Sequence, residues 1–321
     1  MATKKTTKKA ASAASTPRKK TTATATKTTT TRVTTKSQTA SAPIASPARV
    51  NTKLPTNLVN IVIAEILGTF ILTLVALFTS LGMTPLYVGL TLMALVLFIG
   101  GVSGAHVNPA VTFGLWSMRK LQTVLVPFYW AAQFLGAMAA VVLISTLSMG
   151  NFVVHFDHFL DFSWSIFALE LIGMAIFMFG IGAAISRTDL KPTGKAVAIG
   201  SALTVGLIAT STLYPTIQSA AVLKQEKEQT ANLEQLTTEK KPGERMYPRE
   251  VYVGGATLNP AVAMAVTEKT DSQLRNQGMP FREGEKAYTR LSLEVILATL
   301  VGAALGGNLF LLVNYRNKLE A

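Results

Sequence analysis

The sequence predicts an all-α membrane protein, in which six membrane-spanning helices and two re-entrant half-helices form an inverted repeat. Three observations lead to this fold class: six long apolar segments, a tripeptide that occurs twice, and a Glu-x-x-Gly pattern that opens each half of the chain. A helix needs about 20 residues to cross the hydrocarbon core, and it satisfies its own backbone hydrogen bonds there. The six segments of suitable length are 58–81, 86–102, 124–147, 163–185, 196–213 and 291–313.

The repeated tripeptide is Asn-Pro-Ala, and its residues are Asn108, Pro109, Ala110 and Asn259, Pro260, Ala261. Each copy opens an apolar run, 110–116 or 261–266, that is too short to span, so we expect a helix that ends near the midplane. Proline suits the first turn of a helix, and the preceding Asn is a good N-cap. Two such helices meeting at mid-membrane predict a pore that admits neutral polar molecules and repels cations.

The Glu-x-x-Gly pattern marks an internal repeat. Glu65 lies in the first span and Glu170 lies in the fourth, each at the start of three spans. Three spans per half give the two halves opposite orientations in the membrane. We therefore expect one repeat over about residues 58–150 and the other over about residues 163–315.

A charged insert over about residues 216–250 makes the second repeat longer than the first, and it holds six basic and six acidic residues. Two interpretations remain open for it: a mobile solvated loop, or a lid or partner site over the pore mouth. Four apolar side chains fit one side of a helix that would extend the fifth span: Val222, Leu223, Leu233 and Leu236.

The chain of 321 residues has a net charge of +13, and this charge is concentrated at one end. Residues 1–53 contain twelve Lys or Arg and no Asp or Glu, while the remainder is close to neutral. We expect residues 1–57 to form a disordered basic tail, because they are too poor in apolar side chains to bury a core. Contact with anionic lipid is the favoured interpretation, ahead of a transit peptide or nucleic-acid contact. Residues 316–321 are expected to form a short second tail.

Composition also excludes several kinds of chemistry. The chain has no Cys and three His, which leaves no thiol chemistry and no convincing metal site. We find no phosphate-binding Gly loop and no acid–base or nucleophile constellation, so we expect neither an enzyme nor a cofactor. Basic residues outside the spans predict that both termini are cytoplasmic. The residues that indicate this orientation are Arg119, Lys120, Arg187, Lys191, Lys195, Arg316 and Lys318.

These features resemble the major intrinsic protein family, the aquaporins and aquaglyceroporins. Residues 103–112, Ser-Gly-Ala-His-Val-Asn-Pro-Ala-Val-Thr, are very close to the family's first pore loop. Residues 254–261, Gly-Gly-Ala-Thr-Leu-Asn-Pro-Ala, look like the second, and residues 132–136, Ala-Gln-Phe-Leu-Gly, are similar to the family's pattern in the third span. The resemblance covers about residues 58–315, which we expect to be a channel domain.

The resemblance implies a homotetramer in the lipid bilayer, with one pore in each subunit. It implies that Asn108 and Asn259 donate hydrogen bonds to molecules that pass in single file, while opposed helix dipoles exclude protons and cations. It also implies that Glu65 and Glu170 accept backbone amides of the two pore loops and brace them, and that His106 braces the first loop.

Two expectations concern residues outside this pattern of matches. Glu294, near the start of the last span, has no counterpart in the repeat, and we expect its side chain to reach the membrane interface. Val262 stands where the family's second loop usually continues with Arg. Aligned with the family, the other three positions of the outer constriction are Val88, Leu207 and Ala256, so all four filter side chains are apolar. We expect a wider, drier and less discriminating filter than one with a guanidinium.

The function that we predict is passive passage of water, of small uncharged solutes such as glycerol, urea or ammonia, or of both. Two alternatives remain open. The missing Arg, the insert and the basic tail could mark a non-conducting family member with a structural or membrane-organising role. A secondary transporter is the third interpretation, and it would normally carry more charge within the membrane than this chain does.

Overall fold

Six helices in the described part of the chain are long and apolar enough to cross a membrane. The computed structural model describes residues 54–78, 83–149, 152–231, 245–275 and 286–314. Its long helices are α1 (Leu58–Phe78), α2 (Thr84–Ser103), α4 (Val126–Leu147), α5 (Trp164–Ser186), α6 (Pro192–Ala231) and α10 (Leu293–Val313). The predicted fold class is confirmed. The basic tail is described only from residue 54 onward, and residues 316–321 lie outside the described ranges.

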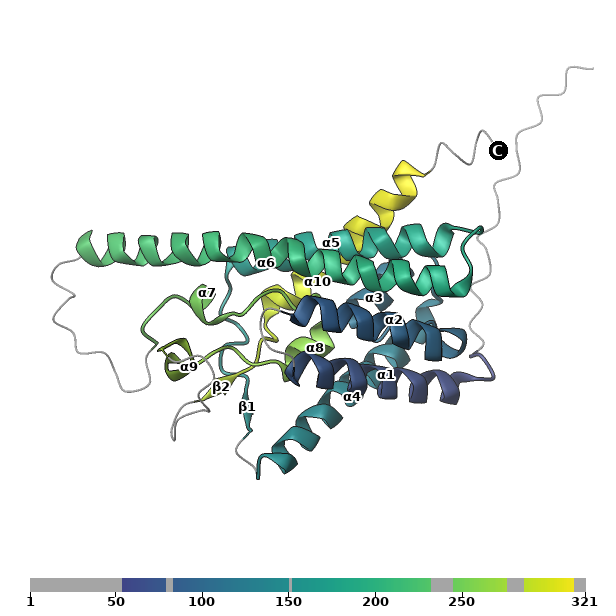
Figure 1. Ribbon diagram of the computed structural model, residues 1–321, viewed down its shortest axis with the longest axis horizontal. Helices are drawn as coiled ribbons and strands as arrows, with labels where there is room; N and C mark the ends of the chain where they lie inside the picture. Colours follow the sequence, from purple (N-terminus) through teal and green to yellow (C-terminus); the bar gives the residue numbers. More distant parts are fainter. Residues whose placement is uncertain (1–53, 79–82, 150–151, 232–244, 276–285, 315–321) are drawn as a thin grey trace, which may run out of the picture. The chain divides into compact units, whose positions relative to one another are not determined.

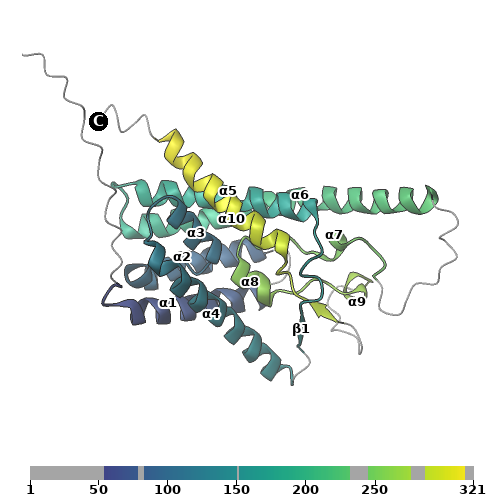
Figure 2. The same ribbon diagram turned by 180° about the vertical axis from the view of Figure 1, so that it is seen from behind.

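The two short apolar runs form half-helices, as the repeated tripeptide predicts. The first is α3 (Pro109–Ser117) and the second is α8 (Pro260–Ala265). Each starts with the Pro of its Asn-Pro-Ala. Proline suits this position, because an N–H at the first position of a helix has no acceptor within the helix. Figures 1 and 2, which view the chain from opposite sides, show both short helices among the long ones.

Helix packing follows the internal repeat. Within each half the first helix packs on the third, α1 on α4 and α5 on α10, and the second helices of the two halves, α2 and α6, pack on one another. Each half-helix contacts the third helix of the opposite half, α3 on α10 and α8 on α4. The halves therefore interlock instead of folding as separate units.

Glycines allow the closest of these helix contacts. A Cβ on Gly136 of α4 would lie 2.3 Å from the carbonyl oxygen of Ile66 on α1. A Cβ on Gly306 of α10 would lie 2.0 Å from the carbonyl oxygen of Ala175 on α5. These backbones approach so closely that no side chain fits between them, which is the usual way that membrane helices pack.

The fifth long helix is longer than the predicted span 196–213. Helix α6 has 40 residues and continues through Pro215 into the charged insert as far as Ala231 (Figure 1). The side-chain amide of Gln218 donates to Glu250 O at 3.3 Å and to Val251 O at 3.2 Å, which ties this extension to the next segment. Of the four apolar side chains predicted for a helix here, Val222 and Leu223 belong to α6. Leu233 and Leu236 lie outside the described residues.

Four short elements lie at the end of the bundle to which the extension of α6 is tied (Figure 1): β1 (Val154–His155), α7 (Arg249–Tyr252), α9 (Asp271–Arg275) and β2 (Ala287–Tyr288). The short helix η1 (Thr123–Leu125) directly precedes the N-terminus of α4, at the opposite end of that helix from β1. Strands β1 and β2 pair in parallel, Val154 with Ala287 and His155 with Tyr288. The prediction of an all-helical chain did not include these strands, because two residues each are too few to leave a pattern.

The expectation for Glu294 is wrong. Its side chain is fully buried, and Oε1 accepts a hydrogen bond from Arg249 Nη1 at 2.6 Å. Arg249 also donates through Nε to Glu268 Oε1 at 2.6 Å, and Arg245 Nη1 donates to Glu268 Oε2 at 2.5 Å. A buried carboxylate is stable when a charged partner is available, and Arg249 comes from a segment far away in sequence.

Candidate pore

The N-terminal tips of α3 and α8 are built in the same way. Asn108 precedes α3, and its Oδ1 accepts a hydrogen bond from Ala110 N at 2.8 Å. Asn259 precedes α8, and its Oδ1 accepts from Ala261 N at 3.0 Å and from Val262 N at 3.3 Å. Each side-chain oxygen thus satisfies amides at the positive end of its own helix.

The two Asn side chains also connect the loops to each other. Asn108 Nδ2 donates to Leu258 O at 2.8 Å, and Asn259 Nδ2 donates to Val107 O at 2.9 Å. Both Asn side chains are buried. An amide NH2 has two hydrogens, so each Asn keeps one N–H beyond the bond to the opposite loop. The tips of the two half-helices therefore meet, although 150 residues separate them in sequence.

The residue before each Asn has a left-handed backbone. The φ angle is +43° at Val107 and +54° at Leu258. Such angles are rare for residues other than Gly and are most unfavourable for β-branched ones such as Val. Strain of this kind persists only where the surroundings enforce it, and it is concentrated at functional sites. Here each strained residue provides the carbonyl that accepts a hydrogen bond from the Asn of the opposite loop.

Glu65 holds the first loop in this conformation. Its Oε1 accepts from His106 N at 2.9 Å and from Ser103 Oγ at 2.6 Å. Its Oε2 accepts from Val107 N at 2.7 Å and from Gln133 Nε2 at 2.8 Å. The carboxylate is fully buried, and four donors satisfy it.

Glu170 occupies the equivalent place in the second loop. Its Oε1 accepts from Thr257 N at 2.8 Å, and its Oε2 accepts from Leu258 N at 2.8 Å. The two amides belong to the residues one and two positions before Asn259, as His106 and Val107 do before Asn108. The family resemblance implied this pairing for both Glu side chains.

Other members of the two carboxylate networks were not predicted. Ser103, Gln133 and Thr257 lie in the segments that carry the family resemblance, so the signal for them was present but not used. His106 Nδ1 lies 3.1 Å from Thr112 Oγ1, and the ring stacks on Tyr129 with centroids 4.4 Å apart. The ring thus joins the first loop to α3 and α4.

The second network contains a buried cation that sequence reasoning missed. Arg290, just before α10, is 2% exposed, and its Nη2 donates to Glu170 Oε1 and to Gly255 O, both at 3.1 Å. The Nε and Nη1 atoms of Arg290 have no hydrogen-bond partner among the described residues. No local pattern marks this Arg, because its partners come from α5 and from the loop before α8.

The four predicted filter positions come from three helices and the loop before α8. Val88 of α2, Leu207 of α6 and Val262 of α8 are buried in one apolar cluster, and Ala256 packs against this cluster. Their neighbours in the cluster include Val107 and Leu258, the residues before the two Asn. The structure thus brings the four side chains into one region, and their role as a filter stays a prediction.

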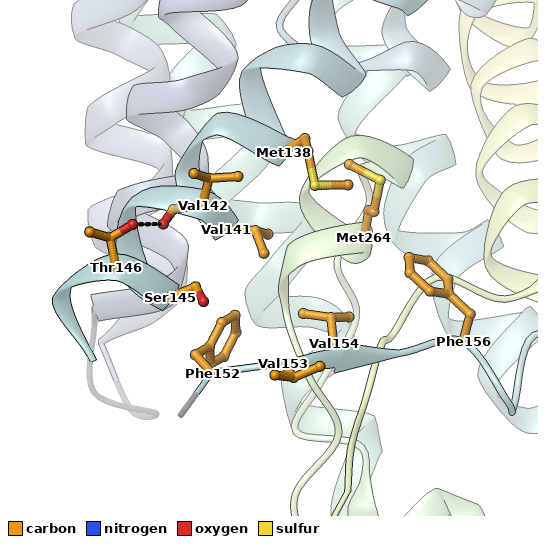
Figure 3. A pocket seen from close by; sticks show the side chains of 10 residues that line it. All are labelled: Met138, Val141, Val142, Ser145, Thr146, Phe152, Val153, Val154, Phe156 and Met264. Carbon is orange, nitrogen blue, oxygen red and sulfur yellow. Dashed lines mark hydrogen bonds between the residues drawn. The ribbon is translucent and has the colours of Figure 1, made fainter. Parts of the chain in front are cut away.

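A separate apolar cavity of about 340 Å³ lies beside the C-terminal half of α4 (Figure 3). Figure 3 shows Met138 and Val142 of α4 facing Phe152, Phe156 and Met264 across it. None of the residues that line it is a predicted pore residue. In the described part of the chain, no group of three or more His, Asp or Glu residues could hold a metal ion.

The fold and the site together define a class: a multi-pass membrane protein with two half-helices joined tip to tip. A model of the major intrinsic protein family matches residues 51–218, about half of the chain. This range includes the first Asn-Pro-Ala and ends before the second. The chain belongs to the major intrinsic protein family, whose members are channels in the lipid bilayer. The predicted family membership is confirmed.

Three curated relatives illustrate the similarity. Aquaporin NIP2-3 of Zea mays is 30% identical over 168 residues, which is 47% of this chain and 54% of the relative. Aquaporin Z of Brucella melitensis is 39% identical over 101 residues, 27% of this chain and 44% of the relative. Nodulin-26 of Glycine max is 37% identical over 128 residues, 37% of this chain and 45% of the relative. The chain spans about half the length of the curated relatives it matches.

A solved structure was also found. It is the X-ray structure of the aquaglyceroporin from Plasmodium falciparum, which aligns with a TM-score of 0.46 and 19% sequence identity. The alignment covers 80% of this chain and 95% of the other.

Proposed function

We propose that this protein is a passive channel for water and small uncharged solutes, and that the path runs past the joined tips of α3 and α8. The observation that carries this proposal is the reciprocal bonding of Asn108 and Asn259. Each amide is held by its cap bond and by the opposite loop, so its remaining N–H has a fixed direction. Two fixed donors at one level suit a molecule that accepts hydrogen bonds and carries no charge.

Selectivity against ions would come from the half-helices. Their N-terminal ends carry partial positive charge, and in this fold the two ends face one another. A neutral molecule can accept hydrogen bonds there, while a proton or a metal cation meets a barrier.

The filter of the proposed channel consists of Val88, Leu207, Ala256 and Val262. With four apolar side chains it offers no hydrogen bond to replace those that water loses on entry. We therefore propose that the channel discriminates weakly among small neutral solutes and that glycerol, urea or ammonia pass as well as water.

The proposed orientation and assembly follow from charge and from the family. We propose that both termini are cytoplasmic, that residues 58–315 form the channel domain, and that four copies assemble with one pore each. The extension of α6 would then project on the side opposite the termini, beside the mouth of the pore. The contact of the basic tail with anionic lipid remains part of this proposal, although residues 1–53 lie outside the described chain.

Osmotic swelling of proteoliposomes tests the function. We expect stopped-flow light scattering to show protein-dependent flux of water, glycerol or urea. Asn259→Ala should reduce this flux, because it removes a cap and a bond to the first loop. Asn308→Ala is the matched control, since Asn308 is an exposed side chain on α10 that binds Ser117 Oγ and Ala304 O. Flux equal to that of empty liposomes would contradict the proposal.

The apolar filter also favours one alternative, a non-conducting member of the family. A narrow ring without polar side chains can expel water and close the path by dewetting. In that case folded protein would produce no flux, and Val262→Arg or Ala256→Ser would restore it. Saturable flux that depends on an ion gradient would instead indicate a secondary transporter.

A further inference from the structure

The second pore loop carries no cation at the position that follows Asn-Pro-Ala. Val262 stands there, as Val111 does in the first loop. An apolar filter carries no charge of its own and opposes a cation only through the hydration that the ion loses there. A further charge that opposes cations at this level must come from another part of the chain.

Arg290 brings a guanidinium to the second loop from the segment between β2 and α10. Its backbone N–H donates to Val266 O at 2.8 Å, and Thr289 Oγ1 donates to Ala263 O and Met264 O, both at 3.0 Å. These carbonyls lie at or just after the C-terminal end of α8, where helical carbonyls lack partners within the helix. The backbone of Arg290 is therefore fixed to the half-helix that carries Val262.

The side chain of Arg290 then reaches the loop that precedes α8. Its Nη2 donates to the carbonyl oxygen of Gly255, which is directly joined to Ala256, one of the four proposed filter residues. The same Nη2 donates to Glu170 Oε1. The guanidinium thus lies one peptide unit behind the filter, in a buried ion pair with Glu170 at 3.1 Å, where solvent screens its charge little.

The geometry is not that of a counter-ion alone. An Arg that neutralises a carboxylate often forms two parallel bonds with it. Here the single nitrogen Nη2 donates both to Glu170 Oε1 and to the Gly255 carbonyl. The Nε and Nη1 atoms have no acceptor among the described residues. Glu65, in the first loop, is satisfied by Ser103, Gln133 and two backbone amides, all of them neutral donors.

We propose that Arg290 is a specificity-determining residue, which supplies from behind the second loop the positive charge that excludes cations from this channel. This inference rests on the proposed function. Arg290 acts through space and through the Gly255 carbonyl, and it does not line the filter itself. The channel would thereby keep an apolar filter for neutral solutes and still oppose ions of positive charge.

The test measures cation and water flux on the same proteoliposomes. Arg290→Gln should raise potassium and proton influx, read with entrapped dyes, by about tenfold or more, because a nearby unit charge is removed. Water flux should change by a smaller factor. Arg290→Met, whose chain fills similar space, is a second neutral variant in case the first does not fold. Arg290→Gln combined with Val262→Arg should return cation influx toward that of the unaltered protein.

Arg249→Gln is the matched control, because Arg249 is a mostly buried Arg that pairs with two carboxylates but does not touch the filter loop. It should lower thermal stability without raising cation influx. Unchanged cation influx in folded Arg290 variants would overturn the inference, and so would equal influx in the Arg249 control. If the unaltered protein passes neither water nor solute, the proposed function fails. A cation leak confined to the Arg290 variants would still support the inference.

Discussion

Asn108 and Asn259 each donate a hydrogen bond to the carbonyl that immediately precedes the other. Asn108 Nδ2 lies 2.8 Å from Leu258 O, and Asn259 Nδ2 lies 2.9 Å from Val107 O. This exchange joins the two halves of the chain at one point and requires a left-handed residue on each side of it. The site therefore depends on both halves, and a substitution that disrupts one loop should also destabilise the other.

Replacing Asn108 by Ala should destabilise the protein by about 2–4 kcal/mol. The loss of the N-cap costs about 1 kcal/mol, and the buried carbonyl of Leu258 that is left unpaired costs about 1–3 kcal/mol more. Thermal unfolding in detergent measures the change. A double-mutant cycle with Asn259→Ala should be non-additive, because the two side chains bridge the same pair of loops. Additivity of the two losses would contradict the coupling.

Replacing Val262 by Arg should narrow the filter. Val262 lies in an apolar cluster with Val88 and Leu207, so a guanidinium placed there takes up space and adds hydrogen-bond donors. We expect glycerol and urea flux to fall by about tenfold, the effect of about 1.4 kcal/mol of added barrier. Water flux should fall less. Parallel swelling assays give both values, and an equal loss for all three molecules would remove Val262 from the filter.

Replacing Gly306 by Ala should force α10 away from α5. The added Cβ would lie 2.0 Å from Ala175 O, and backbone cannot yield as a flexible side chain can. We expect a loss of about 1–3 kcal/mol, as for other overpacked contacts. Gly101→Ala is the control, because nothing lies within 4 Å of its added Cβ. That change should be neutral, or stabilise the helix by up to about 1 kcal/mol. Equal unfolding temperatures for the two variants would argue against this packing.

The buried carboxylate of Glu268 should make stability depend on pH. Burial would raise the pKa of Glu268, but the hydrogen bond from His158 and the charges of Arg249 and Arg245 together lower it from 4.5 to about 2. A lowered pKa in the folded state gives stability that is present above pH 4.5 and is lost as the pH falls toward 2. The loss amounts to about 3 kcal/mol.

Unfolding temperatures measured from about pH 6 down to about pH 2, which covers the range between the unfolded and folded pKa values, check this expectation. Glu268→Gln should flatten the dependence. Asp189→Asn is the control. The hydrogen bond and charge of Arg187 lower the pKa of Asp189 to about 2 as well, but that ion pair is exposed and screened by solvent. A variant Glu268→Gln with the same pH profile as the unaltered protein would contradict the assignment.

Several features of the fold could be predicted because they depend on neighbouring residues. The six spans follow from continuous apolar segments, and α3 and α8 begin within one residue of the predicted runs. The bracing roles of Glu65 and Glu170 followed from the family resemblance, and the pattern that recurs in both halves marked the two positions. The extension of α6 was foreseen only as one of two interpretations, because the same charged composition fits a solvated loop.

Other features could not be predicted because their partners are far away in sequence. Arg290 joins Glu170 across 120 residues, and Arg249 joins Glu294 across 45. Strands β1 and β2 pair across more than 130 residues and are two residues long. Considered alone, Glu294 was expected at the membrane interface, because an unpaired carboxylate is costly to bury in an apolar segment.

The sequence by itself determined the family, the spanning helices and the two half-helices, because apolar length, an N-cap and a following Pro act within a few residues. The tertiary structure decided which loop carbonyl each Asn meets, how the two carboxylates are satisfied, and where the buried cation lies. Those contacts form only when the two halves interlock, since each joins segments from opposite halves or from opposite ends of one repeat. The physical reason is that hydrogen bonds and ion pairs in a low-dielectric interior depend on distance in space, which spacing along the chain does not specify.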